Sequence, residues 1–133
     1  MSRWVLELDD ELLQELLAKE PLLFVDFYAD WCGPCKAVAP VVERAAREYR
    51  GRMTFGKLNI DGSRRAAARF GVRSIPTLIL FRDGKQVSRV QGYIPDHALR
   101  AHLDRYAPPP QADAPGPGPA GRPGLLGRLL GRR

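Results

Sequence analysis

Cys32 and Cys35 are the two cysteines of this 133-residue chain, and only two residues separate them. They stand where an apolar run over residues 22–28 gives way to a segment whose apolar residues recur at helical spacing. Side chains three residues apart on a helix have Cβ atoms roughly 5–6 Å apart, so such a pair can open and close a disulfide with little backbone movement. The spacing therefore predicts reversible thiol–disulfide chemistry.

The two cysteines are expected to have different roles. Cys32 lies at the N-terminus of the predicted helix, where free N–H groups and the helix dipole favour the thiolate, which is the nucleophilic form. We therefore expect Cys32 to be exposed and reactive. Cys35 lies one turn further along, and we expect it to be more sheltered and to act as the resolving thiol.

Two other uses of the cysteines fit the sequence less well. A structural disulfide that closes a loop of about four residues would contribute only about 2 kcal/mol, and a reducing cytosol would keep it open. Zinc is the second alternative, because the cysteines together with His97 and His102 nominally satisfy a finger spacing. About sixty residues separate the two halves of that pattern, so we expect no metal site.

The elements that position the cysteines can be predicted from apolar periodicity. The run over 22–28 is apolar on both faces of its pleat, which is typical of a central strand covered on both sides, and Asp26 interrupts it. From Pro34 onward an apolar stripe predicts a long helix that is kinked at Pro40. The stripe consists of Ala37, Val38, Val41, Val42, Ala45 and Ala46.

Shorter elements complete an α/β layer structure with a mixed sheet. Asp83-Gly84 is a dipeptide favoured in type I′ turns and predicts a hairpin between the strands on either side. The predicted elements are a helix capped by Asp9 or Asp10 and closed by Pro21, a strand over 53–58, a helix over 63–70 ended by Gly71, strands over 77–81 and 86–90, and a helix from Pro95 that buries Leu99, Leu103 and Tyr106.

Composition divides the chain after residue 107. Residues 108–133 hold 7 of the 12 prolines and 6 of the 13 glycines. We predict a globular domain over 1–107, an extended, disordered Pro/Gly-rich linker over 108–124, and a short basic Leu/Arg tail over 125–133. A silent, disordered tail is the favoured interpretation, because its glycines and its length oppose a helix in water. A weak contact with a membrane surface or a partner is the alternative.

Charge and hydropathy exclude several classes of protein. The net charge is +6, but no basic stripe is interleaved with aromatic residues, so we expect no nucleic-acid binding. No stretch approaches the roughly 18 apolar residues of a membrane-spanning helix. Acidic residues near the N-terminus interrupt the apolar core that a secretory signal needs. We therefore expect a cytoplasmic protein, and we also expect it to be a monomer.

Three segments together resemble the thioredoxin family. Residues 25–36 read VDFYADWCGPCK, residues 57–61 read KLNID, and residues 71–77 read GVRSIPT. A Cys-x-x-Cys pair alone is a weak signal, but its combination with the strand aspartate and with Ile-Pro-Thr about forty residues later is highly specific. The resemblance covers essentially all of 1–107 and implies the thioredoxin fold, a central mixed five-stranded sheet flanked by four helices.

The resemblance also implies roles for individual residues. Cys32 would attack a disulfide in a partner protein, and Cys35 would resolve the mixed disulfide. Pro76 matches a cis-proline that faces the cysteine pair, and its proposed role is to let Ile75 offer backbone hydrogen bonds to an extended substrate. The implied substrate-binding rim consists of Trp31, Gly33, Pro34, Ile60, Ile75, Pro76 and Gly92. Ile60 could instead belong to the core.

Asp26 and Lys57 match a buried aspartate and a neighbouring lysine of the family. The aspartate would exchange protons with Cys35. The residues themselves agree, because a carboxyl in an apolar strand has its charged form disfavoured and its pKa raised towards neutrality. The alternatives are a salt bridge that satisfies Asp26 and a Lys57 that is simply a surface residue.

The implied function is protein-disulfide reduction in cell redox homeostasis, with no cofactor beyond the Cys32–Cys35 pair. The implied partners are disulfide-containing proteins and a thioredoxin reductase, a flavoprotein that uses NADPH. A disulfide isomerase or oxidant, and a binding module with incidental cysteines, are the alternatives. Gly33 and Pro34 favour the reductant, because the family's oxidants and isomerases usually carry His before the second cysteine.

Overall fold

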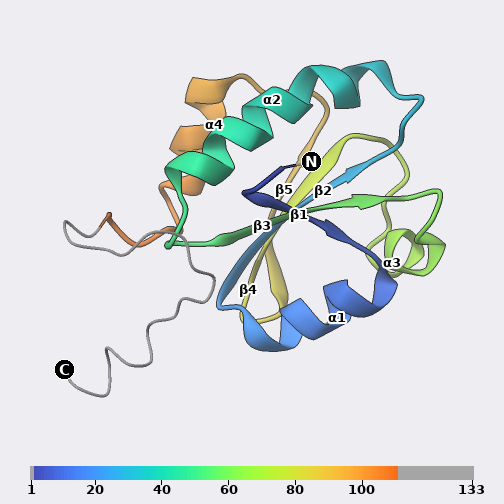
Figure 1. The fold of residues 1–133 in the computed structure, drawn as a ribbon, viewed down its shortest axis with the longest axis horizontal. Helices are drawn as coiled ribbons and strands as arrows, with labels where there is room; N and C mark the ends of the chain where they lie inside the picture. Colours follow the sequence, from blue (N-terminus) through green and yellow to red (C-terminus); the bar gives the residue numbers. More distant parts are fainter. Residues whose placement is uncertain (1, 111–133) are drawn as a thin grey trace.

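A mixed sheet of five strands separates two pairs of helices in the computed structural model, which describes residues 2–110 (Figure 1). The strand order is β1-β3-β2-β4-β5; β1, β3 and β2 are parallel, and β4 runs antiparallel to both β2 and β5. The elements are β1 (Val5–Leu8), α1 (Asp10–Lys19), β2 (Leu22–Tyr28), α2 (Gly33–Glu48), β3 (Thr54–Asn59), α3 (Arg64–Arg69), β4 (Thr77–Arg82), β5 (Lys85–Gln91) and α4 (Asp96–Leu103). The predicted α/β fold with its five-stranded mixed sheet is confirmed.

Strand β2 lies at the centre of the sheet, as its doubly apolar pattern predicts. Its residues from Leu22 to Phe27 are all buried. Alternate residues enter two different cores: Phe24 packs in the cluster that includes α2 and α4, whereas Val25 packs in the cluster that includes α1. In Figure 1 these helix pairs lie above and below the sheet. The end of β2 is therefore a firmly held base for the loop that carries the cysteines.

The helix cap and the turns that were predicted from short sequence patterns are found in the structure. The Asp9 side chain accepts a hydrogen bond from Leu12 N–H and caps α1. Asp83 and Gly84 have φ angles of 50° and 82° at the hairpin turn, and Gly71 has a φ of 62° after α3. The positive φ values explain why turn-forming residues occupy these positions.

Two expectations at the level of elements need correction. Strand β1 is part of the five-stranded sheet, yet the residue pattern indicated no strand over Val5–Leu8, because its buried and exposed residues do not alternate in a regular way. Ala37, which was expected in the buried stripe of α2, is exposed. Within 111–133 the predicted linker and tail lie outside the described residues.

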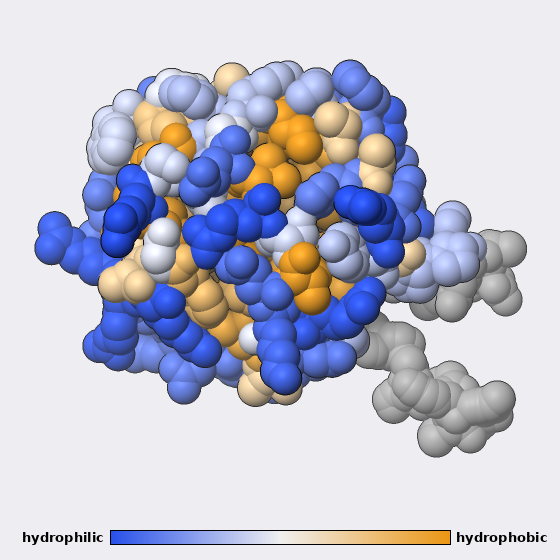
Figure 2. All heavy atoms as spheres, turned by 180° about the vertical axis from the view of Figure 1, so that it is seen from behind, coloured by the Kyte–Doolittle hydropathy of each residue, from blue (hydrophilic) through white to orange (hydrophobic). Residues whose placement is uncertain are grey.

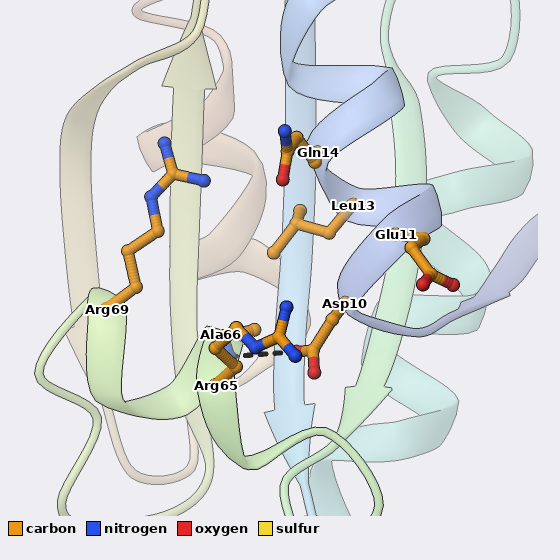
Figure 3. Close-up of a pocket in the computed structure, with 7 residues that line it drawn as sticks. All are labelled: Asp10, Glu11, Leu13, Gln14, Arg65, Ala66 and Arg69. Carbon is orange, nitrogen blue, oxygen red and sulfur yellow. Dashed lines mark hydrogen bonds between the residues drawn. The ribbon is translucent and has the colours of Figure 1, made fainter.

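A small hollow between α1 and α3 is lined by charged side chains (Figure 3). The Asp10 carboxylate of α1 accepts a hydrogen bond of 2.8 Å from Ala66 N–H, in the first turn of α3. Ser63, the residue that precedes α3, makes no capping bond with its own side chain. Asp10 of α1 therefore caps α3, and neither cysteine lines this hollow.

The surface of the domain is mostly hydrophilic on the side opposite to the view in Figure 1, with apolar atoms visible in separate areas (Figure 2). Within residues 2–110, none of the helices is both long and apolar enough to cross a membrane. Helix α2, the longest within these residues, has a buried face on the sheet and a charged face in water.

Gly56 marks a close approach between β1 and β3. A Cβ atom at this position would lie 2.6 Å from Leu8 Cδ1 and 2.8 Å from Leu8 Cγ. Leu8 is itself buried and has little freedom to move. The glycine therefore leaves room for the Leu8 side chain where β1 pairs with β3 at the edge of the sheet.

We expect Gly56→Ala to lower the free energy of unfolding by about 1–3 kcal/mol, because overpacking forces side chains off their rotamers. Urea unfolding followed by circular dichroism measures the effect. Gly62→Ala is the matched control, because a Cβ there meets nothing within 4 Å. Equal unfolding midpoints for Gly56→Ala and the wild type would contradict the close packing of β1.

Candidate active site

Cys32 and Cys35 form a disulfide at the start of α2, with their Cα atoms 5.2 Å apart. Cys32 is the N-cap residue and keeps an extended backbone, with φ −95° and ψ 115°. The Cys35 N–H donates to the Cys32 sulfur over 3.1 Å. A helix N–H directed at a sulfur and the helix dipole both favour negative charge on that sulfur.

The exposure that was expected for Cys32 is not found in this oxidised form. Cys32 is 5% exposed and Cys35 is 4% exposed, so the predicted contrast between an open and a sheltered cysteine is wrong here. The physical reason is that the bonded sulfurs cover each other and an apolar surround covers both. This surround consists of Ala29, Tyr28, Ile60 and Ile75.

The loop before β4 faces the disulfide. The Ile75–Pro76 peptide bond is cis, as the resemblance implied. The Ile75 carbonyl oxygen lies 3.7 Å from the Cys32 sulfur, and the Pro76 carbonyl accepts a hydrogen bond of 2.8 Å from Gly92 N–H. Residues far apart in the chain are thus brought to one place beside the reacting sulfur.

The predicted rim residues gather around the cysteines with different exposures. Trp31 is 68% exposed, and Gly33 and Pro34 are exposed beside it. Ile60, Ile75 and Gly92 are half-buried, and Pro76 is buried. Ile60 contacts both the cysteine cluster and the core beneath α1, so the rim and core interpretations each describe part of it.

Asp61 is a neighbour of the site that the sequence did not single out. Its carboxylate accepts a hydrogen bond of 2.9 Å from the Trp31 indole N–H. The bond holds an exposed aromatic ring in place next to Cys32. No spacing rule could have found it, because the two residues meet only through the tertiary fold.

Asp26 is buried in β2 with an unsatisfied carboxylate. It is 3% exposed, and its Oδ1 has no hydrogen-bond partner. Burial raises the pKa of Asp26 from its ordinary value to about 7, although the positive charge of Lys57 opposes the rise. A carboxyl with such a pKa can both accept and release a proton near neutrality.

Lys57 lies opposite Asp26 on the neighbouring strand β3. Among the described residues its ion pair is made with Glu7, over 3.7 Å, and none is made with Asp26. The alternative of a salt bridge that satisfies Asp26 is therefore wrong. The Lys57 side chain is 39% exposed, which agrees with the alternative of a surface lysine, but its positive charge also acts on Asp26.

The zinc pattern is not assembled in the part of the chain that the structure describes. The two cysteines are bonded to each other, and His97 and His102 belong to α4. Over residues 2–110, no group of three or more His, Cys, Asp or Glu side chains is arranged to hold a metal ion. His102 instead contacts the Ser88 hydroxyl.

The sequence model of the family described as Thioredoxin matches residues 4–105. The chain belongs to the thioredoxin family. A thioredoxin of Synechocystis sp. is 41% identical over 98 residues, which are 74% of this chain and 92% of that protein. Thioredoxin 1 of Nostoc sp. shares 41% identity with the same coverage of both chains. The chloroplastic M-type thioredoxin of Zea mays is 40% identical over 91 residues, which are 68% of this chain and 54% of that protein.

The cysteine pair is accordingly the redox-active centre of a thioredoxin, and the chain is a thiol–disulfide oxidoreductase that reduces protein disulfides. Thioredoxins generally work through this pair and need no separate cofactor. The geometry agrees with that activity, because the pair lies at a disulfide distance where a helix begins.

Folded Asp26 holds its proton to about pH 7, whereas an unfolded aspartate loses it near its ordinary pKa, so the fold loses stability as the pH rises between these two values. We expect Asp26→Asn to remove this loss. Between pH 5 and pH 8, the stability of the oxidised variant should rise by roughly 2–3 kcal/mol relative to the wild type.

Urea unfolding of the oxidised proteins at several pH values measures this difference. Asp30→Asn is the matched control, because Asp30 is an exposed carboxylate just beyond β2. A gap between Asp26→Asn and the wild type that stays constant with pH would show that Asp26 is not buried in the way described.

Proposed function

We propose that Cys32 is the attacking thiolate and Cys35 the resolving thiol of the disulfide reduction. The Cys32 thiolate attacks one sulfur of the substrate disulfide, forms a mixed disulfide and releases the other substrate sulfur as a thiolate. Cys35, once deprotonated, attacks the Cys32 sulfur and releases the second substrate sulfur. Two electrons pass from the dithiol to the substrate, and the Cys32–Cys35 disulfide remains.

The hydrogen bond from Cys35 N–H to the Cys32 sulfur is the observation that carries this assignment. It distinguishes the two cysteines where their burial does not, because a helix N–H is directed at one sulfur only. A donor aimed at a thiolate lowers the free energy of the charged form. The same bond therefore favours Cys32 as the nucleophile that attacks the substrate disulfide.

Asp26 is proposed to accept the Cys35 proton before the resolving step and to return a proton in the reverse reaction. Its pKa of about 7 leaves both protonation states populated near neutrality. Asp26 shares the side of β2 that packs against α2, whose first turn contains Cys35. Lys57 is the positive charge that keeps the ionised form of Asp26 accessible.

The substrate is proposed to bind as an extended segment across the rim. The backbone of Ile75 would pair with the substrate beside Cys32, and the cis-proline Pro76 shapes the loop that presents it. The side chains of Trp31 and Ile60 and the surface of Gly92 would supply apolar contact around this backbone pairing. A rim that is mostly apolar suits many substrates rather than one.

Recycling of the oxidised protein is proposed to come from a flavoprotein reductase that draws electrons from NADPH. The proposal includes a cytoplasmic location and a monomeric state, because a general reductant has to be kept reduced and must meet many partners. The likeness to thioredoxins over most of their length supports this scheme.

We expect Cys32→Ser to reduce insulin disulfides no faster than dithiothreitol alone, because the serine hydroxyl cannot take part in thiol–disulfide exchange. Turbidity of the precipitating insulin chain measures the rate. Cys35→Ser should instead trap the mixed disulfide, because the resolving step is lost. Mass spectrometry of the non-reduced Cys35→Ser protein should find one substrate chain bound to Cys32.

Ser88→Ala is a control that should keep the full rate, because Ser88 lies on β5 and contacts His102 rather than the cysteines. Undiminished insulin reduction by Cys32→Ser would show that Cys32 is not the nucleophile. Trapping of substrate by Cys32→Ser instead of Cys35→Ser would show that the two roles are reversed.

A further inference from the structure

Glu7, Lys57 and Asp26 form a row across three neighbouring strands. Lys57 of β3 is in register with Asp26 of β2 on one side and with Glu7 of β1 on the other. Side chains alternate along a strand, so each of the three shares a face with the residue two positions before it. Those residues all pack in the core that includes α2 and α4; they are Val5, Phe24 and Phe55.

The contacts along this row are unequal. The Lys57 ammonium lies 3.7 Å from Glu7 Oε1, whereas Asp26 Oδ1 has no hydrogen-bond partner. The Tyr28 hydroxyl donates to Glu7 Oε2 over 2.7 Å, and the Lys57 nitrogen lies 5.2 Å from the centre of the Tyr28 ring. Tyr28 therefore holds Glu7 in place, and the two together hold the ammonium at the exposed end of the row.

We propose that Glu7 is a positioning residue that acts on Asp26 through Lys57. By sharing the ammonium, Glu7 limits the stabilisation that Lys57 gives to the ionised carboxylate of Asp26. Asp26 then keeps its proton to a higher pH than it would beside a Lys57 with no second partner. The inference rests on the proposed proton exchange between Asp26 and Cys35, whose working pH range would be adjusted from the edge strand β1.

Apart from Lys57, the groups that face Asp26 from the neighbouring elements do not account for an electrostatic effect on its carboxyl. Its register partner on β4 is Leu78, which does not titrate. The N-cap and first turn of α2 contribute the cysteine pair, which carries no charge while it is oxidised, and the charged residue of that turn, Lys36, is exposed to solvent. Lys57 is the charged group that acts directly on the pKa of Asp26. A change at Glu7 should therefore reach Asp26 mainly through Lys57.

The test is a pH titration of the oxidised full-length protein, followed by the carbon chemical shift of the Asp26 carboxyl in NMR spectra. We expect Glu7→Gln to lower the titration midpoint of Asp26 by roughly half a pH unit. Tyr28→Phe should lower it by less, because it frees Glu7 but keeps the charge and the ring. Glu11→Gln, an exposed change on α1, is the matched control and should leave the midpoint unchanged.

The same titration in a protein that already carries Lys57→Gln shows whether the effect of Glu7 passes through the lysine. In that protein, adding Glu7→Gln should move the Asp26 midpoint by less than about half of the shift that Glu7→Gln causes in the wild type. An unchanged midpoint in Glu7→Gln, or an equal shift with and without Lys57, overturns the proposal. If the carboxyl midpoint moves but the pH profile of insulin reduction does not, Glu7 has the proposed role and the proton exchange between Asp26 and Cys35 is contradicted.

Discussion

The approach of the Cys35 N–H to the Cys32 sulfur is the interaction on which the chemistry of the site depends. It exists because α2 begins immediately after Cys32, and because the buried face of α2 is fixed on the sheet by residues such as Val38 and Val42. A helix N-terminus held in this way acts on the sulfur without any charged side chain. The packing of this helix therefore fixes the donor on which the proposed reactivity of Cys32 depends.

The buried carboxylate beneath the site opposes the stability of the fold. Asp26 is buried in a central strand, with Lys57 and Leu78 as its register partners, and its burial costs free energy whenever it is ionised. The apolar residues of β2 that pack in the cores on both faces of the sheet offset this cost. Burial thus gives this carboxyl a pKa near neutrality, which suits the proton exchange proposed for it.

Much of the fold could be predicted from local patterns. The doubly apolar run of β2, the stripe of α2, the cap at Asp9 and the turn at Asp83-Gly84 each depend on neighbours in the chain, so periodicity and turn chemistry found them. Strand β1 escaped prediction because it is short and irregular in burial. Because β1 was not predicted, the close approach at Gly56 and the position of Glu7 beside Lys57 could not be predicted either.

The sequence by itself determined the redox pair, the helix that begins beside it and the aspartate in the strand before it, because all three lie within a dozen residues of one another. The tertiary structure alone decided that Cys32 is covered, that Asp61 holds Trp31, and that Lys57 pairs with Glu7 rather than with Asp26. These contacts join residues from separate strands and loops. Strand order and register bring them together, and no spacing along the chain encodes either one.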